Sequence, residues 1–293
     1  MIDRWRKRME GDKSMELHVT ETSKEDGVAV VRLNRPGRGN SWTRRMNEEY
    51  RWLMGQHDVD PDVRVIVVTG AGRQFCVGAD FKALDHYVKA EQDYVESTNA
   101  QELPQPGYGV REEFDHEMVW HWGLQKPVIA AINGACAGIA VALASFCDLR
   151  YSVSGAKLTT STPRLGLPAE YGLAWILPRI IGLTHAMDIL LSGRVLVAEE
   201  ADRMGWLNGV FDAETFEARV MQIAKDLAKT TSPIAVKTAK RQVYAELLSA
   251  NVGAAVEDSK RLIGELMKAS DYLEGVKAMQ EKRNPVFAAL SSS

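Results

Sequence analysis

An uncharged segment at positions 128–147, VIAAINGACAGIAVALASFC, constrains the fold of this chain more than any other part of the sequence. By length alone it meets the requirement of about 20 apolar residues for a transmembrane helix. However, Pro127 followed by two β-branched residues favours a strand, and Asn133-Gly134 is a strong turn signal that would interrupt a helix. We therefore predict a buried strand, a turn and a buried helix here, and no membrane span.

Strands and helices are predicted to alternate through much of the chain. β-Branched runs indicate the strands, and apolar residues at mixed three- and four-residue spacing indicate the first helix. The predicted elements are strands at 27–33, 63–69, 128–132 and 149–153 and helices at 41–56 and about 138–146. Strands joined by crossover helices predict an α/β fold with a parallel sheet.

Two regions depart from this alternation. Residues 85–118 are polar with clustered proline and glycine, which predicts a mobile insertion that could form a lid over a site. After Phe211 the pattern turns helical, with predicted helices at 213–229, 234–248, 254–268 and 270–281. We divide the chain into an N-terminal extension, 1–15, an α/β core, 16–211, and a C-terminal helical region, 212–293.

Composition excludes several classes of function. The 36 Lys and Arg against 39 Asp and Glu give a net charge of −3, without the basic excess expected of a nucleic-acid-binding protein. The three cysteines are odd in number and lie in apolar stretches, which suits buried thiols in the cytoplasm better than disulfides. The sequence shows neither metal-ligand spacing nor a phosphate-binding glycine loop. We expect a cytoplasmic protein without a metal or redox cofactor.

Two glycine-containing turns are the strongest candidates for a chemical site. Residues 74–80 and 133–138 each follow a predicted strand, and each places a glycine, Gly78 or Gly138, before the free N–H groups of a predicted helix start. Two such donors that converge on one point would stabilise a developing oxyanion. Each turn by itself is better explained as a tight strand-to-helix connection, but the occurrence of both after successive strands makes the structural and the catalytic interpretation about equal, so both stay open.

Five segments resemble, in this order, the landmark segments of the crotonase (enoyl-CoA hydratase/isomerase) superfamily. They are RQFCVGADFKAL (73–84), KPVIAAINGACAGIAVALASFCDLR (126–150), RLGLPAEYGLAWILPRIIG (164–182), ILLSGRVLVAEEADRMGWLNGVF (189–211) and EKRNPVF (281–287). The resemblance covers roughly 16–288. It implies a crotonase-type spiral of ββα units, a C-terminal helical trimerisation region, assembly as a homotrimer or hexamer, and an acyl-CoA substrate whose CoA enters as part of that substrate.

The resemblance also assigns residues to the acyl-CoA site. The backbone N–H groups of Ala79 and Ile139 would hold the thioester carbonyl in an oxyanion hole, although family members usually have glycine at the second position. Arg38 is a candidate for the nucleotide end. The other substrate-binding candidates are Gly78, Asp80, Phe81, Lys82, Gly138, Ala142 and Thr162.

The chain departs from the family at two catalytic glutamates. Where hydratases carry the acids that activate water and protonate the α-carbon, this chain has Ala142 and Thr162. Because a positioned acid or base supplies a factor of about 100–10,000, two-glutamate hydration should be severely impaired. Glu170 matches the position of an isomerase aspartate, and burial would raise its pKa and suit it to carry a proton. An equally good interpretation is a carboxylate near a helix N-terminus.

We therefore expect an enzyme of the enoyl-CoA hydratase/isomerase family in which double-bond isomerisation by the single carboxylate of Glu170 is favoured over hydration. The alternative is a non-catalytic acyl-CoA-binding protein of the same fold, since the loss of both glutamates is consistent with that function too.

Overall fold

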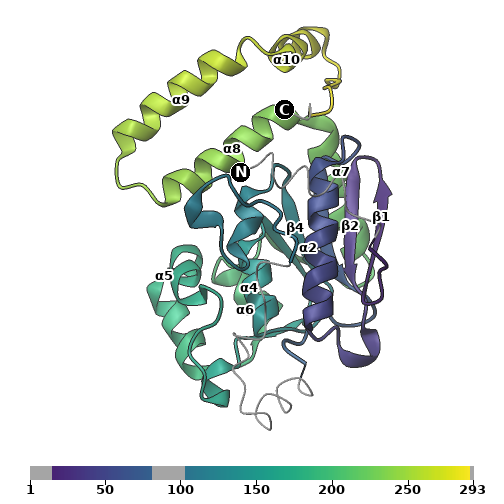
Figure 1. The fold of residues 1–293 in the computed structure, drawn as a ribbon, viewed down its shortest axis with the longest axis vertical. Helices are drawn as coiled ribbons and strands as arrows, with labels where there is room; N and C mark the ends of the chain where they lie inside the picture. Colours follow the sequence, from purple (N-terminus) through teal and green to yellow (C-terminus); the bar gives the residue numbers. More distant parts are fainter. Residues whose placement is uncertain (1–14, 81–102, 291–293) are drawn as a thin grey trace.

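A mixed sheet forms the centre of the fold (Figure 1). The computed structural model describes residues 15–80 and 103–290. The sheet has the strand order β1-β2-β3-β4-β6-β9. Its strands are β1 (Thr20–Glu25), β2 (Val28–Leu33), β3 (Val65–Gly70), β4 (Val128–Ile132), β6 (Leu149–Val153) and β9 (Gly209–Phe211). All neighbouring pairs are parallel except the antiparallel pair of β1 and β2. The predicted α/β fold with a parallel sheet is therefore confirmed.

Alternate residues of the central strands face two different helical layers. Ala29 and Val31 of β2 pack in the same buried cluster as residues of α2 (Arg44–Val59) and α4 (Ile139–Phe146). Val28 and Val30 instead pack against α7 (Phe216–Thr230). Because successive side chains of a strand point to opposite faces, a strand buried on both faces reads as a continuous apolar run. This explains why the short β-branched runs could be recognised as strands.

The uncharged segment at 128–147 is divided between three elements. It forms β4, the short strand β5 (Cys136–Ala137) and α4, with the turn at Asn133 and Gly134 between β4 and β5. The predicted strand, turn and helix are confirmed. A Cβ on Gly134 would lie 1.9 Å from the Arg73 carbonyl oxygen, so glycine is needed there for the close approach of two backbones.

Side-chain caps explain where several helices begin. The first predicted helix, 41–56, is found at Arg44–Val59, because the Thr43 hydroxyl caps it by accepting from the Met46 N–H at 3.2 Å. Asn251 similarly caps α9 (Val252–Leu266), which therefore begins two residues before the predicted start at 254. The remaining C-terminal helices are α8 (Pro233–Leu247) and α10 (Ser270–Glu281).

Helix α5 (Leu173–Ser192) is, among the described residues, the one helix long and apolar enough to cross a membrane. Its backbone leaves the helical conformation at Gly182 (φ 73°, ψ 161°), and Pro178 lies within it. Leu173, Leu177 and other side chains at helical spacing are buried in the core. These side chains fix one face of α5 on the α/β core, and its other face is exposed.

A small second sheet and short helices complete the core. The strands β5, β7 (Lys157–Thr159) and β8 (Leu196–Val197) form this sheet. The short helices are α6 (Ala198–Arg203) and the 3-10 helices η1 (Pro36–Arg38), η2 (Glu112–Phe114), η3 (Val119–Gly123) and η4 (Thr162–Leu165). The sequence pattern did not indicate these elements, because they are too short to show a periodicity.

The second half of the predicted mobile insertion at 85–118, residues 103–118, is anchored to the rest of the structure. Leu103, Phe114 and Met118 are buried in the core, and Arg51 of α2 donates to the Pro104 carbonyl and forms a 3.1 Å ion pair with Glu117. These apolar and ionic anchors fix 103–118 against the body of the protein, so the prediction is wrong for this part. Residues 85–102, the rest of this predicted insertion and lid, lie outside the described residues.

Helix α8 is joined to the core by a buried ion pair. Lys240 donates to the Lys126 carbonyl at 2.9 Å and to the Asp148 carboxylate at 2.8 Å, and Tyr244 donates to the same carboxylate at 2.8 Å. The side chains of Lys240 and Asp148 are only 6% and 15% exposed. Beyond α8, α9 and α10 project away from the sheet (Figure 1).

Replacing Lys240 with Met should lower the free energy of unfolding by about 3–5 kcal/mol, because the Asp148 carboxylate would stay buried without its cation. Chemical denaturation followed by circular dichroism measures this change. The control is Lys260→Met on α9, whose exposed pair with Glu257 should contribute at most about 1 kcal/mol. Equal effects of the two substitutions would contradict the assigned role of the buried pair.

Candidate active site

The two predicted glycine turns lie side by side at the carboxyl ends of β3 and β4. Cys76 donates its N–H to the Ala135 carbonyl at 3.1 Å, and Ala137 donates to the Cys76 carbonyl at 3.0 Å. These bonds form an isolated parallel bridge between Cys76 and Cys136. Burial raises the pKa of the Cys76 thiol to about 12, so this thiol is a neutral packing group at neutral pH. The bridge brings together two segments that are far apart in the sequence.

Gly78 and Gly138 allow the two turns to approach closely. Their φ angles are +98° and +53°, which side chains rarely adopt. A Cβ on Gly78 would lie 3.2 Å from the Ala137 carbonyl oxygen, and one on Gly138 would lie 3.8 Å from the Gly78 Cα. The neighbouring backbone leaves little room for a side chain at Gly78, whereas at Gly138 the positive φ is what favours glycine.

The amides that follow these glycines have no protein acceptor within the described parts of the chain. Neither Ala79 nor Ile139 donates its N–H there, whereas the Gly138 N–H is bonded to the Thr159 carbonyl at 3.0 Å. Ile139 opens α4, so its N–H is one of the free donors of a helix start. The Ile139 side chain is buried in the core, which leaves the backbone as the part that can serve a ligand.

The Glu170 carboxylate lies beside the second turn. Its Oε2 atom is 3.5 Å from the position of a Cβ on Gly138. Glu170 is partly buried, and its carboxylate makes no hydrogen bond or ion pair with the part of the chain that the structure describes, whereas its backbone carbonyl accepts from the Leu173 N–H at 2.9 Å. Burial raises its pKa above the usual value for a glutamate. An unpaired carboxylate of this kind is suited to accept and release a proton.

The next residue, Tyr171, has a φ of 44°, which is an unfavourable conformation for a tyrosine. Gly172 then forms the N-cap of α5 in a left-handed conformation (φ 80°). Glu170 therefore belongs to a strained turn that leads into α5. The expected position near a helix N-terminus and the proximity to the glycine turns are both present.

Two predicted site positions carry no ionisable side chain. Ala142 is fully buried in α4, and Thr162 opens η4 with 2% exposure. The Thr162 hydroxyl is buried and has no hydrogen-bond partner among the described residues. Glu170 therefore carries the carboxylate that lies beside the two turns without a hydrogen-bond partner in the described structure.

The other candidates occupy different surroundings. Asp80 was predicted to lie along the substrate, but its carboxylate accepts from Arg35 at 3.0 Å and from Ser41 at 3.1 Å. Arg38 is exposed at the end of η1. Phe81 and Lys82 lie outside the described residues, as does the predicted helix that would follow Asp80. Ala79 itself pairs with Trp42 in an isolated bridge.

Three residues that lie next to the site were not predicted from the sequence: Arg35, Asn40 and Ser41. Asn40 is fully buried with a φ of 55°, and it accepts from the Arg35 N–H and donates to the carbonyls of Ala71 and Gln74. A signal existed in the run Arg35-Pro36-Gly37-Arg38-Gly39-Asn40, which is rich in turn residues. The contacts of this turn could not be predicted, because Asn40 bonds to the carbonyls of Ala71 and Gln74, which are more than thirty positions away in the sequence.

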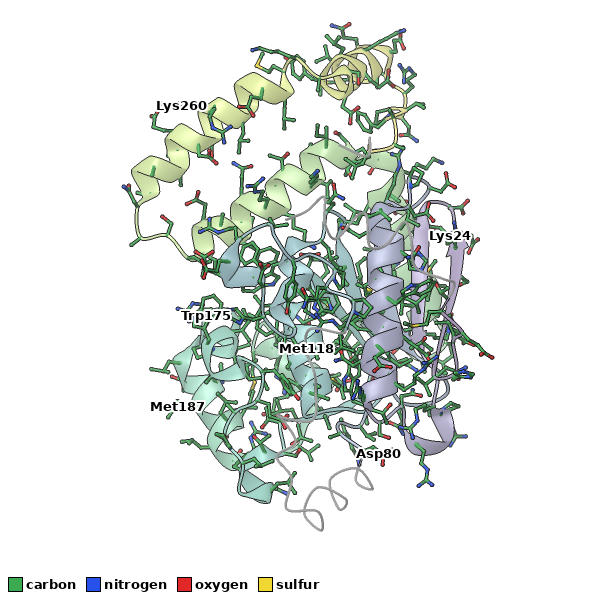
Figure 2. The ribbon with its side chains drawn as sticks, viewed as in Figure 1. Lys24, Asp80, Met118, Trp175, Met187 and Lys260 are labelled. Carbon is green, nitrogen blue, oxygen red and sulfur yellow. The ribbon has the colours of Figure 1, made fainter. Side chains whose placement is uncertain are left out.

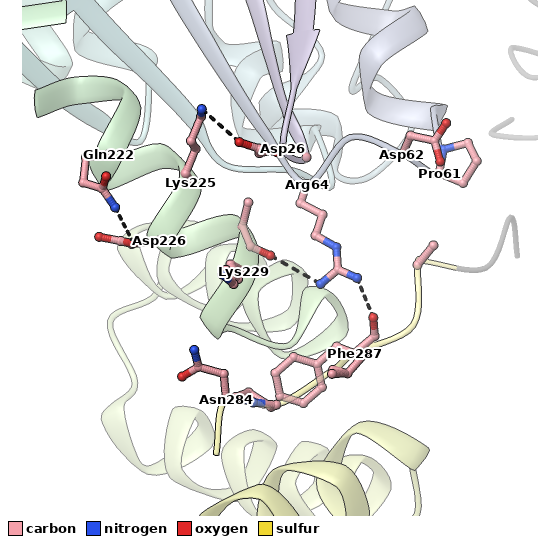
Figure 3. Close-up of a pocket in the computed structure, with 15 residues that line it drawn as sticks. Asp26, Pro61, Asp62, Arg64, Gln222, Lys225, Asp226, Lys229, Asn284 and Phe287 are labelled. Carbon is pink, nitrogen blue, oxygen red and sulfur yellow. Dashed lines mark hydrogen bonds and ion pairs between the residues drawn. The ribbon is translucent and has the colours of Figure 1, made fainter. Parts of the chain in front are cut away.

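A cleft of about 790 Å³ opens at the other end of the sheet (Figure 3). Arg64, which precedes β3, donates there to the carbonyls of Ala228 and Phe287, and Lys225 pairs with Asp26 at 2.9 Å. Figure 2 labels one residue toward each end of the sheet: Asp80 at the end with the glycine turns and Lys24 toward the opposite end. None of the described candidate residues lines this cleft.

The described part of the chain also contains no group of three His, Cys, Asp or Glu suited to hold a metal ion.

Comparisons with known proteins show the family of this chain. The profile of the family described as Enoyl-CoA hydratase/isomerase matches residues 23–289. A 1,2-epoxyphenylacetyl-CoA isomerase of Escherichia coli is 34% identical over 269 residues, which cover 90% of this chain and 95% of the relative. A peroxisomal Delta(3,5)-Delta(2,4)-dienoyl-CoA isomerase of Arabidopsis thaliana is 28% identical over 286 residues, 96% of this chain and 99% of the relative. An enoyl-CoA hydratase structure from Bacillus anthracis superimposes with a TM-score of 0.80 at 28% identity, covering 92% of this chain and 99% of that one.

Replacing Glu170 with Gln should raise the melting temperature at pH 8 and leave it unchanged near pH 4. Because burial raises the pKa of Glu170 in the folded state, ionisation destabilises the native protein as pH rises through that pKa, whereas glutamine stays neutral. Below the usual glutamate pKa of about 4.3 both side chains are uncharged, so the difference disappears. Calorimetry at the two pH values tests this, with exposed Glu214→Gln as the control. A variant that melts lower than the wild type at pH 8 would show that the carboxylate stabilises the fold.

Proposed function

Because the chain belongs to the enoyl-CoA hydratase/isomerase family, we propose that it isomerises a double bond in the acyl group of a CoA thioester, with Glu170 as the proton carrier. The observation that carries this proposal is the unpaired carboxylate of Glu170, whose Oε2 lies 3.5 Å from the position of a Cβ on Gly138. The relatives include proteins named as isomerases and proteins named as probable hydratases, so the preference for isomerisation rests on the residues of the site and not on those names.

In the proposed site, the N–H groups of Ala79 and Ile139 hold the thioester carbonyl. Three observations support this role: the two turns are bridged through Cys76 and Cys136, neither amide has an acceptor in the described parts of the chain, and both follow glycines that let a ligand approach the backbone. Preorganised donors of this kind stabilise negative charge that develops on oxygen and are typically worth a factor of about 100–1,000 each.

One carboxylate is sufficient for the proposed reaction. Glu170 takes a proton from the α-carbon of a 3-enoyl thioester, and the electron pair of that C–H bond moves through the double bond and the carbonyl to give a dienolate. The oxyanion is held by Ala79 and Ile139. Glu170 then returns the proton to the γ-carbon, which yields the 2-enoyl thioester. No water, electron or cofactor is consumed, and CoA takes part only as a portion of the substrate.

Hydration is disfavoured by the residues at the positions of the two hydratase glutamates. Ala142 offers a methyl group, and a threonine hydroxyl such as that of Thr162 is a poor base near neutral pH. Addition of water needs one group to activate the water and another to protonate the α-carbon. The proposed site has Glu170 for one of these tasks, and the carboxylate of Asp80 near the first turn is bonded by Arg35 and Ser41.

We also propose that the protein assembles as a homotrimer or hexamer in the cytoplasm. Leu183, Met187 and Leu191 form a stripe on α5 and are 67%, 45% and 68% exposed. Val252 and Val256 on α9 are also exposed, and no residue of α9 is buried. Apolar stripes on a helix of the core and on a projecting helix are suited to pack against other copies of the chain. Buried free cysteines support the cytoplasmic location.

Glu170→Gln should lower the rate of isomerisation of a straight-chain 3-enoyl-CoA by about 100-fold or more and leave its binding unchanged, because the amide cannot accept the proton. Turnover is followed by ultraviolet absorbance of the conjugated product, and binding by calorimetry. Glu214→Gln is the control for loss of one carboxylate.

Three outcomes separate the candidate functions. Isomerisation that the substitution abolishes supports the proposal, and isomerisation at an unchanged rate excludes Glu170 as the base. Wild-type protein that binds 2-enoyl-CoA and 3-enoyl-CoA but converts neither would instead establish the alternative, a non-catalytic acyl-CoA-binding protein.

Leu191→Glu should shift the protein from a trimer or hexamer toward smaller species, because it places a charge in the proposed apolar contact. Sedimentation velocity measures the distribution of species. Ser23→Glu on the exposed edge strand β1 is the matched control and should sediment like the wild type. An unchanged sedimentation coefficient for Leu191→Glu would place the contact elsewhere.

A further inference from the structure

Arg35 is held close to the proposed oxyanion hole without facing it. We propose that Arg35 is a positioning residue that acts through Asp80 to orient the Ala79 amide toward the substrate carbonyl. This inference rests on the proposed function, since it assigns the cause of the orientation of one of the two donors.

The guanidinium group of Arg35 connects two segments of the chain. It donates to the Asp80 carboxylate at 3.0 Å and to the carbonyl and hydroxyl oxygens of Ser41 at 2.7 and 2.9 Å. The Ser41 hydroxyl in turn donates to the same Asp80 oxygen at 3.1 Å. The side chains of Arg35 and Asp80 are 21% and 13% exposed, so water screens the pair only weakly.

Backbone hydrogen bonds transmit this contact to the Ala79 amide. The Asp80 N–H donates to the Trp42 carbonyl at 3.1 Å, and the Trp42 N–H donates to the Gly78 carbonyl at 2.7 Å. The Gly78 carbonyl and the Ala79 N–H belong to one planar trans peptide unit, in which they point in opposite directions. Because Trp42 holds the carbonyl on one side, the Ala79 N–H must point to the other side, away from Trp42.

Arg35 is itself rigidly placed. Its backbone N–H donates at 2.8 Å to the side chain of Asn40, which is fully buried and bonded to Ala71 and Gln74. A guanidinium group can bond Ser41 and Asp80 at the same time with its planar fork of donors, whereas an ammonium group is a point charge that cannot reproduce this geometry. The chemistry of the contact therefore calls for arginine and not for any cation.

Without Arg35, Asp80 would lose this ion pair, and the bridge of Ala79 with Trp42 would lose the side-chain support that Arg35 gives it. The peptide unit could then rotate, and the Ala79 N–H would be averaged over several directions. The free energy that a donor contributes to an oxyanion falls steeply once the hydrogen-bond angle departs from linearity. The expected effect is thus on the reacting carbonyl more than on substrate affinity.

The test compares Arg35→Met with Arg32→Met, a matched change of an arginine that pairs with Glu21 and Glu217. The readouts are the infrared stretching frequency of the thioester carbonyl in bound crotonyl-CoA labelled with ¹³C, and kcat and KM for a 3-enoyl-CoA. Wild type and Arg32→Met should lower the carbonyl frequency equally. Arg35→Met should move the frequency back toward that of free crotonyl-CoA and reduce kcat by about 10–100-fold, with a smaller change in KM.

Two further variants keep the inference testable if Arg35→Met does not fold. Arg35→Lys retains the charge and loses the fork, and Asp80→Asn retains the shape and loses the charge, so both should shift the carbonyl frequency in the same direction. Folded variants with the wild-type frequency and kcat would overturn the inference while leaving the proposed function intact. A wild-type protein that neither shifts the frequency nor turns over would overturn the proposed function, and this inference with it.

Discussion

Two backbone hydrogen bonds between the segments that follow β3 and β4 hold the candidate site together. They join Cys76 to Ala135 and Ala137 across a parallel bridge, and they require glycine at Gly78 and Gly138 on the two sides of the contact. Because parallel strands end at the same edge of a sheet, both turns emerge together. Without that bridge, the Ala79 and Ile139 amides would belong to two unrelated loops.

The proposed role of Glu170 in proton transfer depends on the lack of a cation or hydrogen-bond donor at its carboxylate in the described structure as much as on its position. A carboxylate in a polar network would have an ordinary pKa and would stay ionised, whereas partial burial without a cation raises the pKa of Glu170. The contrast with Asp80 is instructive, because that carboxylate is bonded by Arg35 and Ser41. We therefore propose different tasks for these two acids: proton transfer for Glu170 and alignment of the backbone for Asp80.

Much of the α/β core could be predicted because its signals are local. The strands β4 and β6 and the helix α10 begin and end where their apolar runs and breakers do, and caps such as Thr43 moved other boundaries by a few residues. β1 gave no signal, since the sequence TETSKE has one buried position and five exposed ones. The anchors Leu103, Phe114 and Met118 were likewise hidden in a polar stretch, because their burial depends on partners elsewhere in the chain.

The sequence by itself determined the family, the two glycine turns, and the identities of Ala142, Thr162 and Glu170, because each is a matter of residue identity at a position. Only the tertiary structure decided that the turns touch, that the Glu170 carboxylate lies beside Gly138, and that Asp80 is occupied by Arg35. The physical reason is that a hydrogen bond or a desolvated charge depends on distance in space, and segments such as 35–41 and 78–80 become neighbours only once the sheet has formed.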